Sequence, residues 1–241
     1  MNRGVYAAAG GMVASQRSMD VLANNLANAM TPGYKRDEVA FADEMERVLY
    51  ANGGAGGAIG TMGSGPIEKA QYTVFDVGQV EPTGNALDFA IRSPEGAFAV
   101  RTPDGVRYTR NGSFQLNLDG LLLTKDGHPV LDSTLNVIQI PPGHLEVESD
   151  GRLRIDGNEI AQLGVFRGDF YKVGRTLLDS ANAQLVQTPD VIHRALEGSN
   201  VQSIHEMIEL IRVNRSFELA QRAVQQQDDS SKALFQVLSG G

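Results

Sequence analysis

Two heptad patterns, one at each end of the chain, constrain the fold of this 241-residue sequence more than any other feature. In each, apolar or small residues recur every seven positions, with a second set three positions later. This spacing turns one face of a helix towards another helix. The N-terminal set comprises Val5, Ala8, Met12, Ser15, Met19, Leu22, Leu26 and Ala29. The C-terminal set comprises Leu210, Val213, Phe217, Ala220, Val224, Gln227, Ser231, Leu234 and Leu238. We therefore predict a helix over residues 2–30 and a second long helix at the C-terminus.

Local signals mark where these helices stop and start. Pro32 lacks a backbone N–H and disfavours the helical conformation at Thr31, and Gly33 permits a sharp change of direction. Ser199 or Asn200 is the expected N-cap of the second helix. An asparagine inside a helix is unfavourable unless its amide has a partner. The last turns of the first helix nevertheless carry Asn24, Asn25 and Asn28. They are read either as solvated amides of a frayed helix end or as amides that contact a partner.

Composition excludes several classes of protein. The formal charge of −8, from 29 acidic and 21 basic residues, argues against a nucleic-acid surface, which requires a basic patch. The absence of cysteine excludes disulfides, thiolate nucleophiles and cysteine-based metal sites. No apolar run approaches the roughly 20 residues of a membrane helix. The first residues are read as helix and not as a cleaved signal peptide, because their apolar stretch is short and the heptad pattern runs through it.

The segment after the first helix divides into two parts. Asp37–Tyr50 has Phe41, Met45, Val48 and Leu49 at helical spacing, so we expect a short amphipathic helix there. Ala51–Gly65 is rich in glycine but has neither of the glycine spacings that bind phosphate. It is read as a flexible linker.

From Gln71 the hydrophobic period changes to two, which indicates strands. Turn dipeptides that favour positive φ punctuate this region at Asp104, Asn111, Asp119, Asp126, Asp150 and Asp156, each followed by glycine. We expect an antiparallel meander over residues 106–125. The other expected strands are 87–91, 97–101, 135–140, 145–148, 153–155 and 162–167.

These patterns together predict a discontinuous α+β fold. The N- and C-terminal helices pair as a coiled-coil-like helical domain, and an all-β, antiparallel domain is inserted between them. The expected divisions are 1–36 for the first helix, 37–70 for the amphipathic helix and linker, 71–195 for the β domain, and 196–241 for the second helix.

No arrangement of residues indicates catalysis. The four histidines, His128, His144, His193 and His205, include no pair at the spacing of a helical metal site. The zinc motif fails because residue 209 is Glu, and no nucleophile elbow occurs. Asp228 and Asp229 are adjacent and therefore point about 100° apart on a helix. We expect no enzyme activity, no cofactor, no metal and no small-molecule substrate.

The apolar surface of the helices exceeds what one antiparallel pair can cover. Ile204, Ile208 and Ile211 form a stripe offset from the second heptad set, and Arg215 lies on the same broad face. Uncovered apolar edges join subunits, and a repeated heterologous contact generates a ring or an open helix. The sequence therefore favours a self-assembling structural protein. An adaptor or export chaperone that caps a helical partner is the alternative.

Three stretches of the chain resemble the flagellar rod and hook protein family. Leu22–Arg36 resembles its N-terminal signature, Leu87–Phe114 its β domain, and Glu197–Glu218 its C-terminal signature. The resemblance implies a structural subunit of the bacterial flagellar rod, with the terminal helices lining the export channel and the β domain facing outward. It also implies export through the flagellum's own channel to the periplasmic rod of the basal body, without a cleaved signal.

The resemblance also narrows the place in the flagellum and the partners. Hook subunits carry further inserted domains, for which this chain has no room, so the rod is favoured. The proximal rod is favoured over the distal rod because the segment between Phe41 and the β domain is short. The expected partners are copies of this chain and neighbouring rod or hook subunits. The residues expected at these interfaces are Val5, Met12, Met19, Leu22, Asn24, Asn25, Leu26, Asn28, Pro32, Gly33, Tyr34, Asn200, Val201, Ile204, Met207, Ile208, Leu210, Ile211, Arg215, Phe217, Val224, Leu234 and Leu238.

Overall fold

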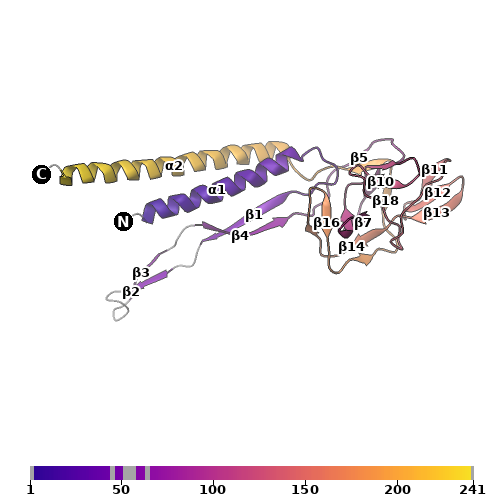
Figure 1. The fold of residues 1–241 in the computed structure, drawn as a ribbon, viewed down its shortest axis with the longest axis horizontal. Coiled ribbons are helices and arrows are strands. Elements are labelled where there is room, and N and C mark those ends of the chain that lie inside the picture. The colour runs from indigo at the N-terminus through magenta and orange to yellow at the C-terminus, as the bar shows by residue number, and fades with distance from the viewer. Residues whose placement is uncertain (1–2, 44–46, 51–57, 63–65, 240–241) are drawn as a thin grey trace. The chain divides into compact units, whose positions relative to one another are not determined.

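The fold is given by a computed structural model, which describes residues 3–43, 47–50, 58–62 and 66–239 (Figure 1). The chain divides into two compact units. We call the first the helical unit; it comprises Met1–Leu26, Asp37–Tyr72 and Gln202–Gly241. We call the second the β-rich unit; it comprises Ala27–Arg36 and Thr73–Val201. The predicted α+β class is confirmed, since terminal helices flank a β-rich region. The segment 27–36, expected to belong with the first helix, belongs instead to the β-rich unit.

Both terminal helices are present, with shifted ends. Helix α1 spans Arg3–Ala27 and helix α2 spans Ser203–Ser239. The first helix ends before residue 30, because residues 28–30 already form a turn ahead of Pro32. The second begins after the expected N-cap, so the assignment of Ser199 or Asn200 as a cap is wrong. Both side chains make other hydrogen bonds: the Ser199 hydroxyl accepts one from the Val201 N–H, and Asn200 is described below.

The predicted amphipathic helix at Asp37–Tyr50 is wrong. Strand β1 (Asp37–Asp43) pairs with β4 (Pro66–Thr73), and β2 (Arg47–Tyr50) pairs antiparallel with β3 (Ala58–Met62). A short apolar run cannot be assigned by period alone, and here pairing with later strands of the chain supplies the backbone hydrogen bonds. The expected linker is also partly strand, since β3 lies within it. Residues 51–57 and 63–65 of that linker lie outside the described residues.

The β-rich unit is built around a six-stranded sheet in the order β15-β16-β8-β7-β14-β17. Its strands are Tyr171–Lys172, Leu177–Asp179, Gly105–Thr109, Gly96–Thr102, Val165–Arg167 and Gln184–Leu185, in that order. Three two-stranded sheets join β5 (Val80–Pro82) to β19 (Ala195–Glu197), β6 (Phe89–Ile91) to β18 (Val191–His193), and β9 (Phe114–Leu116) to β10 (Leu122–Thr124). A three-stranded sheet contains β11 (Leu145–Val147), β12 (Arg152–Ile155) and β13 (Asn158–Gln162).

The strand pairing corrects part of the sequence prediction. Of the meander over residues 106–125, the second half is confirmed, because β9 and β10 pair antiparallel. The first half is wrong, because β8 pairs with β7 and β16 and not with β9. Turn dipeptides give the positions of hairpins but not which strands meet afterwards. The expected strand at 135–140 is replaced by isolated bridges, among them Leu131 to Val137.

The turn dipeptides behave in two ways. The glycine of every Asp-Gly pair has positive φ, as expected: Gly105, Gly120, Gly127, Gly151 and Gly157. At the hairpin between β12 and β13, Asp156 also has positive φ, which is the pattern of a type I′ turn. The same expectation is wrong for Asn111-Gly112. A Cβ at Gly112 would lie 1.7 Å from the carbonyl oxygen of Phe89, so this glycine permits close packing of two backbones.

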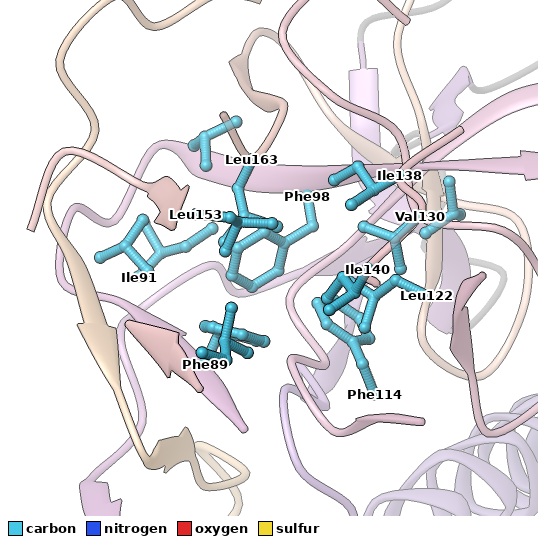
Figure 2. Close-up of a cluster of buried hydrophobic side chains, with 14 of the residues drawn as sticks. Phe89, Ile91, Phe98, Phe114, Leu122, Val130, Ile138, Ile140, Leu153 and Leu163 are labelled. Carbon is cyan, nitrogen blue, oxygen red and sulfur yellow. The ribbon is translucent and has the colours of Figure 1, made fainter. Parts of the chain in front are cut away.

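Strand β7 explains where the core lies. Phe98 and Val100 belong to a large apolar cluster, and the alternate residues Ala97 and Ala99 belong to a smaller one. Because successive side chains of a strand point to opposite faces, β7 is buried on both sides. Figure 2 shows the large cluster, in which the ring of Phe114 lies edge-on to Phe98 at a centroid separation of 5.4 Å. Burying each such side chain stabilises the fold by about 1.5–3 kcal/mol.

Candidate subunit interface

The predicted N-terminal heptad set lies on the partly covered face of α1. The side chains of Ala8, Met12, Ser15, Met19, Leu22 and Leu26 are all half-buried, as is Ala29 beyond the helix. Val13, which lies off this set, is 69% exposed. The side chain of Val5 lies outside the described residues. The covered face is broader than the heptad set, since Gly11, Ala14 and Ser18 are half-buried and Val21 is buried. The heptad pattern thus identifies part of the face of α1 that the subunit itself covers.

The C-terminal heptad set has the same character. Leu210, Val213, Phe217, Ala220 and Val224 are half-buried, while most of the residues between them are exposed. Gln227, further along the same set, is exposed. The side chains of Leu234 and Leu238 lie outside the described residues. A hydrogen bond from Asn25 to Glu206 joins the two helices near the end of α1 and the start of α2. Coiled-coil pairing along their length remains a prediction.

A second apolar surface on α2 is exposed to solvent. It consists of Ile204, Met207, Ile208 and Ile211, whose exposed fractions are 73%, 44%, 53% and 52%. We call these four residues the α2 patch. Arg215 is exposed one turn beyond Ile211, where its long side chain extends the same face. Contiguous exposed apolar side chains mark surfaces that bind another protein.

Two of the three helix-end asparagines are buried and hydrogen-bonded. Asn25 is 1% exposed; its amide donates to the Asp37 carbonyl at 2.9 Å and to Glu206 at 3.3 Å, and its oxygen accepts from the Asp37 N–H at 3.0 Å. This one side chain therefore joins α1, β1 and α2 within the helical unit. In the β-rich unit, Asn28 is also buried and its side-chain oxygen accepts from the Thr31 hydroxyl. Asn24 is exposed.

The residues after α1 pack into the β-rich unit. The Gly33 N–H donates to the Glu197 carbonyl at 2.8 Å. A Cβ at Gly33 would lie 2.3 Å from the carbonyl carbon of Arg110, and its φ is +67°. The Tyr34 ring is buried, and the Lys172 ammonium lies 4.1 Å from its centroid. Only glycine fits at position 33, and Tyr34 contributes to the interior of the subunit.

Next to this segment lies a buried ion cluster that the sequence patterns do not reveal. Glu197 is surrounded by four donors: Lys35 at 2.5 Å and the Gly78 N–H at 3.0 Å contact one oxygen, and Arg110 contacts the other through two nitrogens at 2.7 and 2.6 Å. All three charged side chains are buried. Burial lowers the pKa of Lys35 below its ordinary value of 10.5, although the Glu197 carboxylate raises it. The one available signal is that Lys35, Arg110 and Glu197 each lie in a different one of the three stretches that resemble the family.

Asn200 ties together backbone segments at the edge of the same unit. Its side-chain oxygen accepts from the Arg36 N–H at 2.7 Å, and its amide donates to the carbonyls of Val74 and Asp76 at 2.8 and 3.3 Å. The Val74 N–H in turn donates to the Arg36 carbonyl at 2.9 Å. The next residue, Val201, is buried. The chain leaves the β-rich unit after Arg36 and returns to it at Thr73. Asn200 therefore joins the backbone on both sides of that interruption in one hydrogen-bonded network.

A groove of about 930 Å³ in the β-rich unit has no catalytic arrangement at its walls. It is lined by Leu87, Leu116, Leu118, Pro141 and Pro142 together with a few polar groups, among them His144 and Arg194. Among the described residues, those with a shifted pKa are Lys35, Tyr108, Tyr171 and Lys232, and none of them lines it. His193 is used structurally, since its ring stacks on Phe89 and contacts the Ala86 carbonyl.

Metal sites and membrane spans are the other features that could indicate a function. Within the part of the chain that the structure describes, no group of three or more His, Cys, Asp or Glu side chains could hold a metal ion. Neither described helix has a stretch long and apolar enough to cross a lipid bilayer.

Comparison with known proteins identifies the family. Three family models match: Flagella basal body rod protein over residues 5–35, Flagellar hook protein FlgE/F/G D1 domain over 91–155, and Flagellar basal body rod FlgEFG protein C-terminal over 193–237. The chain is 32% identical to flagellar basal-body rod protein FlgF of Rhizobium meliloti, over 100% of this chain and 99% of that protein. It is 31% identical to flagellar basal-body rod protein FlgG of Bacillus subtilis, over 95% of this chain and 96% of that protein. It is 32% identical to FlgF of Caulobacter vibrioides, over 90% of each chain. The chain therefore belongs to the flagellar basal-body rod protein family.

Proposed function

We propose that this chain is a structural subunit of the bacterial flagellar rod and that it polymerises through its terminal helices into the helical axial tube of the basal body. The observation that carries this proposal is the α2 patch, an exposed apolar surface in a chain that aligns over its full length with proteins named for the rod. Its partners would be copies of itself and neighbouring rod or hook subunits. It would reach the periplasmic rod by flagellar export, without a cleaved signal peptide.

The energetics of the α2 patch suit repeated assembly. Burying a large aliphatic side chain contributes about 1.5–3 kcal/mol. The four patch residues are partly exposed, so each would contribute a fraction of that in every subunit. A single contact of this size does not hold two proteins together against the entropy of association. A helical lattice repeats the contact and adds others, and the interface set predicted on α1 and α2 supplies candidates for these.

Within the rod, we favour a proximal position. The support for this is the length of the segment between Phe41 and the β-rich unit, which contains two strand pairs and no further domain among its described residues. FlgF and FlgG relatives both align over nearly the full chain, so the length of that segment is the feature that favours the proximal position.

The alternative, an export chaperone or adaptor, lacks support from the relatives named above, all of which are called rod proteins. An enzymatic role likewise lacks support, since those relatives are named for a structure. The proposal assigns the chain a purely structural part.

Electron microscopy tests the proposed function directly. The purified chain is concentrated and examined alone and after mixing with cell extract from a mutant that lacks it. We expect the purified chain to form tubes, filaments or rings. We also expect a labelled chain, expressed in cells, to be found in their purified basal bodies. A stable complex of fixed stoichiometry with one soluble partner, and no label in basal bodies, would support the chaperone instead.

A further inference from the structure

We infer that Glu197 holds the segment Thr31–Arg36 on the β-rich unit in the free subunit. We call the contacts of this segment with Arg110, Lys172, Glu197 and Asn200 the clamp. Three residues of this segment, Pro32, Gly33 and Tyr34, are predicted at a subunit interface. In the structure the segment contacts residues of its own chain, on the β-rich unit. The segment thus has a role inside the subunit, whichever part of the flagellum the subunit joins.

The first support is the saturation of the Glu197 carboxylate. Both oxygens accept two hydrogen bonds, from Lys35 and the Gly78 N–H on one side and from Arg110 on the other. Lys35 also donates to the Asp76 carbonyl at 2.6 Å. A buried carboxylate is tolerated only when it is paired and hydrogen-bonded in this way. If the segment left the β-rich unit, Lys35 would leave too, and Glu197 would lose one of its two cations.

The second support is the position of Arg110, which the β-rich unit holds independently of the clamp. Its guanidinium donates to the carbonyls of Ser93 at 2.6 Å and Ile91 at 3.0 Å, and to that of Gly96. A fixed guanidinium leaves Glu197 in place as a preformed acceptor for Lys35. The Gly33 backbone then lies directly against the backbone of Arg110 and donates to the Glu197 carbonyl.

The third support is that the residues on both sides of Lys35, Tyr34 and Arg36, also contact the β-rich unit. The Tyr34 ring is buried under Lys172, whose ammonium also donates to the Lys35 carbonyl at 2.6 Å. On the other side, Arg36 is held by Asn200 and Val74. A segment with buried side chains and satisfied backbone groups on both sides of one ion pair is part of a folded core and not a free linker.

Hydrogen exchange in the unassembled full-length chain tests this inference. The protein is kept at a concentration at which sedimentation shows a monomer. The amides of Gly33, Arg36 and Val74 are followed, because each donates a hydrogen bond of the clamp, and Ala99 in β7 serves as the core reference. The amides of Gly33 and Arg36 are expected to be protected in the wild type. Exchange at the rates of an unstructured peptide would overturn the inference.

Two variants test whether Glu197 closes the clamp. Glu197→Gln removes the charge that balances two buried cations, and should speed exchange at Gly33 and Arg36 by roughly 100-fold while Ala99 stays protected. Asn200→Ala removes the acceptor of the Arg36 N–H and provides a milder variant should Glu197→Gln fail to fold; it should speed exchange at Arg36. The control is Glu81→Gln, an exposed glutamate on β5 opposite Leu196. Protection unchanged in both variants would show that the clamp is not closed by these residues.

Discussion

Asn200 accepts a hydrogen bond from the backbone N–H of Arg36 at 2.7 Å, although 164 residues separate the two in the chain. Its amide also reaches the carbonyl of Val74, which lies just after the chain returns to the β-rich unit at Thr73. Residues that leave and enter this unit are therefore joined by one side chain. The N-terminal and C-terminal signatures, far apart in sequence, meet in the same small region of the β-rich unit.

The close approach of Gly33 to Arg110 predicts a large effect of one methyl group. Gly33→Ala adds a Cβ that would lie 2.3 Å from backbone and also places alanine at a φ of +67°. We expect the free energy of unfolding to fall by about 3 kcal/mol or more, from strain together with displacement of the segment. Thermal or denaturant unfolding of the purified chain measures this.

Gly84→Ala is the matched control for that substitution. Gly84 has a φ of +75°, but a methyl group added there would meet no atom within 4 Å, so it tests the backbone strain alone. We expect Gly84→Ala to lower the free energy of unfolding by about 1 kcal/mol. Equal losses in the two variants would show that the contact between Gly33 and Arg110 is not tight in solution.

The buried amide of Asn25 predicts a specific weakness in the helical unit. Asn25→Ala leaves the backbone of Asp37 and the Glu206 carboxylate without that partner. Leaving buried polar groups unsatisfied costs about 1–3 kcal/mol each. We expect faster proteolysis at the start of α2 and a free energy of unfolding lower by about 2 kcal/mol. The control is Asn24→Ala, which should lower the free energy of unfolding less because the side chain of Asn24 is exposed. Similar effects of both substitutions would contradict the assignment.

The lowered pKa of Lys35 predicts a pH-dependent stability. Because burial places the folded-state pKa below the unfolded value of 10.5, the unfolded chain binds more protons over the window between them. The contribution of this site to stability therefore rises with pH across that window. We expect the melting temperature of the wild type to rise relative to that of Lys35→Met as the pH increases towards 10.5. A difference that moves the opposite way would show that the folded-state pKa is raised.

Particular residues show how much of this structure could be predicted from sequence. The heptad residues were found because a helix repeats its environment at a fixed local spacing, and the Asp-Gly turns were found because their conformation is local too. The helix prediction fails at strand β1 because its partner β4 comes later in the chain, beyond β2 and β3, and leaves no local pattern. The same holds for the ion cluster: Lys35, Arg110 and Glu197 carry no local pattern, and only the tertiary fold brings them together.

If the α2 patch joins neighbouring subunits in the rod, a single charge placed within it should keep the chain out of the rod. Ile208→Asp places a charge in the patch, where an apolar contact would strand it without a partner. Because Ile208 is 53% exposed, the melting temperature of the free subunit should change little. Gln221→Asp introduces the same carboxylate at an exposed position of the same helix. The measurement is the amount of each variant in purified basal bodies. We predict that Ile208→Asp is absent and Gln221→Asp is present at the wild-type level; incorporation of Ile208→Asp at the wild-type level would contradict the account.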